Sequence, residues 1–174
     1  MKKTIMTLLF IFIAYFIISV GIEENIVIPE DSIRIRILAN SNSEYDQNIK
    51  SKVKVDIQNY MADLLSEVTT NKEAEKTIIK NLENIDKKVE SSLQLLDYEL
   101  PYKINFGLNY FPEKEYKGVK YKSGYYESLL VTLGEGKGDN WWCILFPPLC
   151  LVEAEESTEV EYTSFVKEIL DKYV

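Results

Sequence analysis

The segment Gly134–Cys150, with the sequence GEGKGDNWWCILFPPLC, brings together residue types that could support phosphate, redox or metal chemistry. Its glycine spacing matches neither the Walker phosphate loop nor the G-x-G-x-x-G dinucleotide motif. We therefore expect a turn between two extended segments, in which glycine supplies positive φ angles. The residues assigned to this loop are Gly134, Gly136, Lys137, Gly138 and Asn140.

The two cysteines, Cys143 and Cys150, do not have the Cys-x-x-Cys spacing of a redox motif. A zinc site would need two further carboxylate ligands, which is an unusual ligand set, so we predict no metal and no cofactor. A disulfide that closes a small projecting loop is the favoured interpretation. The alternative is that both thiols are buried and inert.

The chain contains no histidine among its 174 residues, which excludes Ser-His-Asp triads, Cys-His dyads and histidine-ligated zinc within one chain. Carboxylates could still act as acid and base in a cell-wall glycosidase, and Glu127 and Glu135 are the pair we considered. Surplus carboxylates on an acidic protein are normally solvated, so we predict that the chain is not an enzyme. Its formal net charge of -8 also argues against nucleic-acid binding.

The N-terminus predicts export. Two lysines precede Ile5–Val20, which contains no charged residue, so residues 1–21 are interpreted as an export signal or a signal anchor. We expect contact with the membrane only through this segment. A linker over residues 22–31, a domain over 32–152 and an acidic tail with a possible short helix over 153–174 complete the expected organisation.

Apolar periodicity predicts the elements that position these residues. Ser32–Ala39 alternates isoleucine with arginine and predicts a strand, and Ser43 with Asp46 resembles a capping box that opens a long amphipathic helix. A second capping signature at Thr70 precedes another apolar stripe that runs to Leu96.

From Tyr102 the apolar period changes to two, which predicts the strand Tyr102–Tyr110, a short hairpin around Val119 and Tyr121, and the strand Tyr125–Leu133. These elements predict an α+β fold with a small, mainly antiparallel sheet packed against two long amphipathic helices. The order of the strands does not follow from the sequence.

The aromatic and apolar residues of the glycine segment suit either a protein interface or a core, and composition leaves both open. Two prolines restrict the segment, so ordering it on binding would cost little entropy. The candidate contact residues are Trp141, Trp142, Phe146, Pro147, Pro148 and Leu149.

Three strings, Ile37–Val53, Phe111–Gly136 and Gly134–Cys150, closely resemble the stage II sporulation protein R family of spore-forming Firmicutes. The resemblance extends in colinear order from about Ile33 to Val152. The family usually has Ala-Asn-Ser-Asp-Ser where residues 39–43 of this chain are Ala-Asn-Ser-Asn-Ser, so that Asn42 replaces the aspartate. The family also often has histidine where this chain has Arg36. At these two positions the chain departs from the family pattern.

The resemblance implies a secreted sporulation signal that is made in the forespore and exported to the space between forespore and mother cell, or to the extracytoplasmic face of the membrane. Its partner would be a membrane-embedded aspartic protease, which then processes the sigma-E precursor. The candidate contact residues would bind that protease. The alternatives are a wall hydrolase and a module that binds cell-wall glycan through exposed tyrosine and tryptophan rings.

Overall fold

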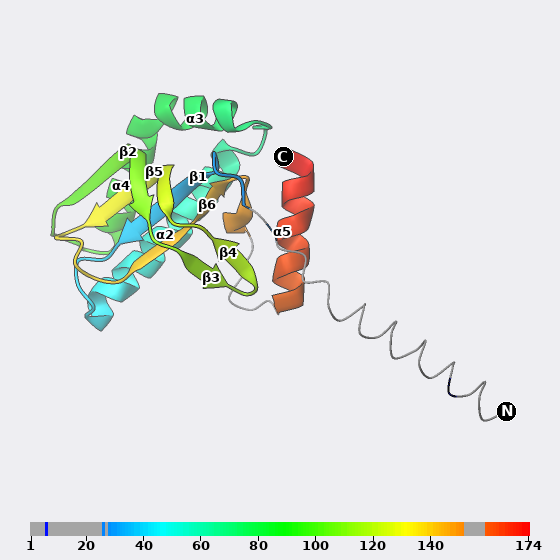
Figure 1. Ribbon diagram of the computed structural model, residues 1–174. Helices are drawn as coiled ribbons and strands as arrows, with labels where there is room; N and C mark the ends of the chain where they lie inside the picture. The colour runs from blue at the N-terminus through cyan, green and yellow to red at the C-terminus, as the bar shows by residue number, and fades with distance from the viewer. Residues whose placement is uncertain (1–5, 7–25, 27, 152–158) are drawn as a thin grey trace.

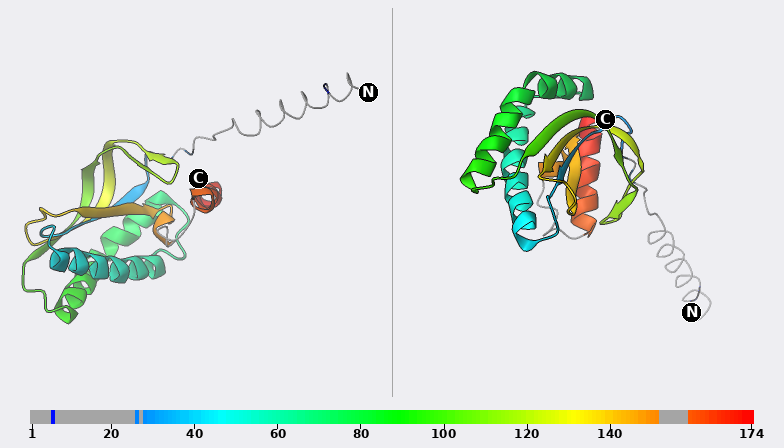
Figure 2. Two further views of the ribbon diagram at one scale, coloured as in Figure 1. Left: turned by 90° about the horizontal axis from the view of Figure 1, so that it is seen from below. Right: turned by 90° about the vertical axis from the view of Figure 1, so that its left-hand side faces the viewer.

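The computed structural model describes residues 6, 26, 28–151 and 159–174 of the chain. A four-stranded sheet with the order β2-β5-β1-β6 lies between a layer of helices and a second layer formed by a β-hairpin and the C-terminal helix (Figures 1 and 2). The predicted export signal lies outside the described residues except for Met6, and so do residues 152–158 of the tail.

The central strand β1, Ile33–Leu38, confirms the predicted alternation. Ile33, Ile35 and Ile37 are buried on the helix side of the sheet. β1 pairs in parallel with β5, Gly124–Leu133, and antiparallel with β6, Asn140–Phe146. β2, Tyr102–Phe111, pairs antiparallel with β5, so the sheet is mixed and mainly antiparallel, as predicted.

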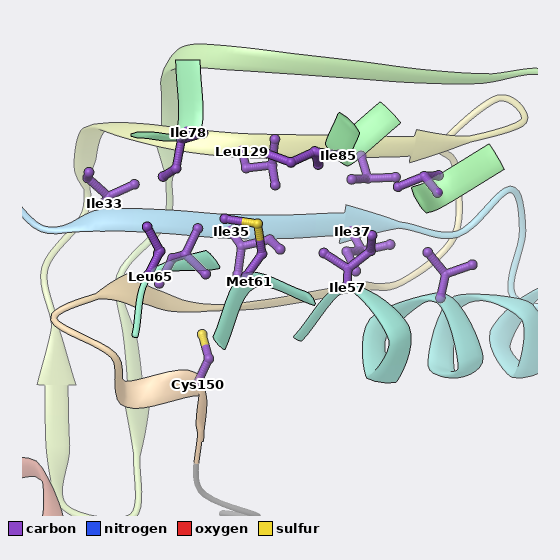
Figure 3. Close-up of a cluster of buried hydrophobic side chains, with 14 of the residues drawn as sticks. Ile33, Ile35, Ile37, Ile57, Met61, Leu65, Ile78, Ile85, Leu129 and Cys150 are labelled. Carbon is purple, nitrogen blue, oxygen red and sulfur yellow. The ribbon is translucent and has the colours of Figure 1, made fainter. Parts of the chain in front are cut away.

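The first predicted helix is α2, Glu44–Leu64. Its N-cap is Ser43, whose side chain accepts a hydrogen bond from the Asp46 amide, as the capping signature predicted. Residues spaced three and four apart on α2 pack on β1 and β5, and Figure 3 shows Ile57 and Met61 beside the β1 isoleucines. This contact forms the main hydrophobic core.

The prediction of a single second helix is wrong. The apolar stripe that was assigned to it forms two helices, α3 over Asn71–Lys80 and α4 over Leu82–Leu95. Asn81 separates them with φ -104° and ψ 10°, and its side-chain amide donates to the Thr77 carbonyl oxygen at 2.8 Å. Asparagine favours such local bonds over continued helix. The predicted N-cap at Thr70 is confirmed, since its side chain accepts from the Glu73 amide.

The remaining strands agree with the predicted period of two, except in the glycine segment. β3, Lys114–Tyr116, and β4, Val119–Tyr121, form the predicted hairpin. Strand β6 is the extended segment predicted after the glycine turn, but it includes residues that were expected to project as a loop. It occupies one edge of the sheet and leads into a short 3-10 helix, η1, at Leu149–Leu151.

The predicted C-terminal helix is α5, Glu159–Tyr173. It packs mainly with the hairpin in a second core, where the hydroxyl oxygens of Tyr121 and Tyr162 lie 2.7 Å apart. Its last residue, Tyr173, also contacts Phe146 of the main core, with ring centroids 5.3 Å apart. Within the described residues, no helix combines the length and apolar character needed to cross a bilayer.

Candidate functional site

The glycine turn that follows β5 is bonded to the loop that follows β1. The Lys137 amide donates to the Asn40 carbonyl oxygen at 3.1 Å, and the Gly138 amide donates to the Ala39 carbonyl oxygen at 2.9 Å. The Asn40 side chain accepts from the Glu135 amide at 3.0 Å. Segments far apart in sequence are therefore interlocked at the end of the sheet where β1 and β5 terminate.

The glycines are required by this packing. Gly134 and Gly136 have φ angles of 56° and 63°, which confirms the predicted use of glycine for positive φ. A Cβ atom on Gly138 would lie 2.2 Å from the Ser41 carbonyl oxygen, so the two backbones approach too closely for a side chain. Two amides of the turn already donate to residues 39–40, so they are not available to cradle a phosphate.

Asp46 organises the other half of the interlock. Its Oδ2 accepts from the Ser41 hydroxyl at 2.5 Å and from the Asn40 amide at 3.0 Å. The Ser41 hydrogen bond is the main cause that lowers the pKa of Asp46, with Asn40 and Ser43 contributing. Asp46 lies in the first turn of α2, where the helix dipole favours an anion. The N-terminus of α2, which could otherwise bind an external anion, is therefore occupied by the chain's own carboxylate.

Asn42, where the resembling family usually has aspartate, uses its side-chain oxygen in this interlock. Asn42 Oδ1 accepts from the Asp139 amide at 2.6 Å and from the Gln47 side-chain amide at 3.3 Å. A carboxylate could accept both of these bonds. The departure therefore leaves the local hydrogen-bond geometry intact.

Trp141 and Trp142 lie on opposite faces of the sheet because they are consecutive residues of β6. Trp142 contacts Phe111 and Tyr121 edge to face, with ring centroids 5.6 and 5.3 Å apart, on the hairpin side. Trp141 packs against the main core, where the Lys54 ammonium lies 5.3 Å from its ring centroid. Each tryptophan is partly exposed, and they do not form one surface.

The rest of the predicted contact segment is mostly interior. Phe146 and Leu149 are 1% and 2% exposed, and Pro147 is also buried, whereas Pro148 is partly exposed. The expectation of a projecting loop is therefore wrong. Strand pairing of β6 with β1 places this segment in the sheet and directs its apolar side chains into the two cores.

Cys143 and Cys150 are free thiols in the structure, and the predicted disulfide is not present. Cys150 is 5% exposed, points into the main core (Figure 3) and donates from Sγ to the Ile144 carbonyl oxygen at 2.8 Å. Burial raises the pKa of the Cys150 thiol well above its usual value. No group of three or more potential ligands within the described residues could hold a metal ion.

Arg34 is an internal cation that the sequence did not reveal. The alternation of β1 placed it on a basic face, but the side chain is only 1% exposed. Its guanidinium carbon lies 3.3 Å from the Tyr126 ring centroid and about 5 Å from the rings of Phe111 and Trp142, at 5.1 and 5.4 Å. The aromatic residues of β2, β5 and β6 were the sequence signal that could have indicated a buried site for Arg34. These residues surround Arg34 only because of the strand order, which the sequence did not provide.

Leu108, Tyr110 and Tyr125 form an exposed patch at the opposite end of β2 and β5 from the glycine turn, which we call the β2–β5 patch. Their exposed fractions are 69%, 52% and 72%. Tyr110 lies directly opposite Tyr125 in the strand register, and their rings meet edge to face at 5.6 Å. The sequence predicted a half-exposed strand here but not this cluster, because the partner strand was unknown.

The considered pair of catalytic carboxylates is not assembled. Glu127 lies on β5 and Glu135 follows the end of that strand at Leu133, so about 20 Å of extended chain separates them. Glycosidase carboxylates lie within about 10 Å of each other. Glu135 instead forms a surface ion pair with Lys137, 2.8 Å between Oε2 and Nζ.

The fold and these contacts define an α+β domain in which the glycine segment serves packing and loop interlocking, and in which the β2–β5 patch is exposed. Comparisons with known proteins identify the family. Residues 29–156 match the family model described as stage II sporulation protein R. The stage II sporulation protein R of Bacillus subtilis (strain 168) is 33% identical over 171 residues, which cover 92% of this chain and 76% of the relative.

The chain therefore belongs to the stage II sporulation protein R family, as its sequence motifs indicated. This membership supports a role in sporulation. No solved structure matched this chain significantly.

Proposed function

We propose that this chain is an exported sporulation signal that activates a membrane-embedded aspartic protease, which then processes the sigma-E precursor. Family membership across 92% of the chain is the observation that carries this proposal. The predicted N-terminal signal would deliver the domain to the space between forespore and mother cell. There the domain would act on the protease as a ligand and not as a catalyst.

The geometry of the described residues is compatible with a ligand. They contain no metal-binding cluster, and the carboxylate pair considered for glycoside hydrolysis is far apart. Exposed aromatic surface is present instead, at the β2–β5 patch. Aromatic side chains are the residues that most often dominate the binding energy of protein interfaces.

Activation requires differential binding. A ligand shifts a receptor toward its active arrangement only if it binds that arrangement more tightly than the inactive one. A hundredfold shift in population corresponds to about 2.7 kcal/mol of differential binding. A few aromatic contacts can supply this difference. The proposed action therefore needs a modest surface and no chemical step by the chain.

The predicted contact segment can contribute through only part of its length. Trp141, Trp142 and Pro148 retain exposed surface, whereas Phe146 and Leu149 are buried in this arrangement. We retain the three partly exposed residues as candidate contacts. The buried ones would act by holding β6 in place.

Reconstitution in a non-sporulating bacterium tests the function. The full chain, the candidate protease from the same organism and the sigma-E precursor are co-expressed, and precursor cleavage is followed by immunoblot. We expect cleavage that depends on both the chain and the protease, and loss of cleavage when residues 1–21 are deleted so that the chain stays inside. Absence of cleavage, with a cognate set from another sporulating species working in parallel, would contradict the proposal.

A further inference from the structure

The outer edge of β2 is an open strand edge. β2 is the terminal strand of the sheet (Figure 1). Its pairing with β5 runs without a register shift from Tyr102 to Phe111. Natural proteins usually protect such an edge with proline, a bulge, several charges or a covering element. Lys103 is the single charged residue of β2, and the strand contains no proline. The Tyr110 carbonyl oxygen already accepts a hydrogen bond from the Arg36 guanidinium at 3.2 Å, and the rest of the edge is suited to pair with another strand.

The β2–β5 patch lies beside this edge. Leu108 and Tyr110 are on β2 itself, on the same face of the sheet, and Tyr125 is the direct partner of Tyr110 on β5. A strand added to β2 would lie about 4.8 Å from it, so alternate side chains of that strand would pack against Leu108 and Tyr110. Backbone pairing and side-chain burial would thus occur together.

A carboxylate lies across the patch from the open edge. Glu127 is the cross-strand partner of Leu108. Partial burial is the main cause that raises its pKa, and the nearby Glu75 carboxylate on α3 raises it further. Among the described residues, neither glutamate forms an ion pair. The two carboxylates therefore lie near each other without a neutralising cation.

We propose that the outer edge of β2, together with the β2–β5 patch, binds an extended segment of a partner protein with apolar side chains facing Leu108 and Tyr110 and a lysine or arginine reaching Glu127. Glu127 lies two strand spacings, about 9.6 Å, from the added strand. A long basic side chain can cover this distance by laying its methylene stem over Leu108.

Charge favours a basic partner segment over a second copy of the chain. Two copies paired through β2 about a two-fold axis would bring two identical surfaces together. Each surface carries Glu127 and Glu75, and each chain has a formal net charge of -8. Self-pairing would therefore add repulsion, whereas a basic segment would relieve it.

This inference deepens the proposed function and depends on it for the identity of the partner. The first experiment uses purified full chain and overlapping peptides that cover the extracytoplasmic segments of the candidate protease, with binding measured by fluorescence anisotropy. We expect one peptide to bind that alternates apolar residues and contains lysine or arginine. Leu108→Thr with Tyr110→Thr should weaken its binding at least tenfold, and Glu127→Gln should weaken it severalfold and reduce the salt dependence.

The matched control is Val55→Thr, which changes another exposed apolar residue, 50% exposed and on α2, and should leave binding unchanged. Threonine keeps the strand propensity of β2, and circular dichroism checks that each variant is folded. Binding that the β2 variants do not weaken, or the absence of any binding peptide, would overturn the proposal. A dimer of the wild type that these variants dissociate, or pelleting with cell-wall sacculi that they abolish, would assign the surface to another occupant.

The same variants separate this inference from the proposed function. In the reconstituted strain, wild-type chain that supports cleavage, together with an equally active Leu108→Thr, Tyr110→Thr variant, would overturn the role of the patch and leave the function standing. Loss of cleavage by this variant alone, with Val55→Thr active, would support both. If wild-type chain gives no cleavage, the function fails, and the peptide measurement still decides whether the edge binds extended chain.

Discussion

Arg34 is held by aromatic rings and not by a carboxylate. Its guanidinium stacks on Tyr126, while its Nε and one terminal nitrogen, Nη1, are buried without a hydrogen-bond partner. Burial lowers the pKa of Arg34, although arginine stays protonated in proteins. Cation–π contact with a desolvated ring can contribute about 2 kcal/mol. The planar shape of the guanidinium is therefore as important here as its charge.

Replacement of Arg34 should separate shape from charge. We expect Arg34→Lys to lower the free energy of unfolding by about 3 kcal/mol, because an ammonium cannot stack and would remain buried without a partner. Arg34→Met, which fills a similar volume without a charge, should cost less than about 1.5 kcal/mol. Urea unfolding measures both. A lysine variant as stable as the wild type would contradict this account of the site.

Asp46 should give the interlocked loops a dependence on pH. Its pKa is lowered in the folded chain, so its stabilising contribution is present above the unfolded value near 3.9 and is lost as the pH falls through the folded pKa. Asp46→Asn should destabilise the protein by about 1–2 kcal/mol at pH 7. The difference from wild type should shrink below about pH 4. A difference that stays constant from pH 7 to pH 3 in urea unfolding would contradict this role.

Local sequence signals predicted the residues that act locally. The capping signatures at Ser43 and Thr70 and the positive φ angles of Gly134 and Gly136 depend on near neighbours, and the structure confirms them. Arg34 and Asn40 were not identified, because their partners come from other strands and loops. Strand order decides those contacts, and periodicity contains no information about strand order.

At the scale of elements, β6 shows why composition misled. Tryptophan, proline and leucine serve interfaces and cores equally well, so Gly134–Cys150 was consistent with either. Pairing with β1 along Ile33–Leu38 makes most of the segment part of the fold. The broken helix has a similar origin, since the apolar spacing of Ala74, Ile78, Ile85 and Val89 continues across the break at Asn81. A continuous apolar stripe therefore does not reveal where one helix ends and the next begins.

Trp142 should therefore behave mainly as a packing residue of β6. Its ring contacts Phe111 and Tyr121, so we expect Trp142→Ala to lower the free energy of unfolding by about 3 kcal/mol. Val55→Ala, on an exposed face of α2, should change it by less than about 0.5 kcal/mol. Urea unfolding gives both values. A fully stable Trp142→Ala protein that no longer supports precursor cleavage would place Trp142 in the interface instead.

At the scale of the whole molecule, the fold class and most elements followed from the sequence, whereas the exposed surface that we propose for binding did not. The sheet has a helix layer on one face and a second layer of hairpin and α5 on the other, so little of its central area is available for a partner (Figure 2). The open edge of β2 and the patch beside it lie outside this cover. The exposure of a residue depends on how the layers of the fold cover one another, and the sequence of a single segment does not specify it.

The central claim is that the chain acts as a bound ligand, and titration of the chain against the protease tests it most directly. In the reconstituted strain, expression of the full chain is varied, both proteins are quantified by immunoblot, and the rate of sigma-E precursor cleavage is measured. We predict that the rate rises with the chain and saturates near one chain per protease, because only occupied protease is active. Maximal cleavage at a small fraction of that ratio would mean that each chain acts repeatedly, and it would contradict the ligand account.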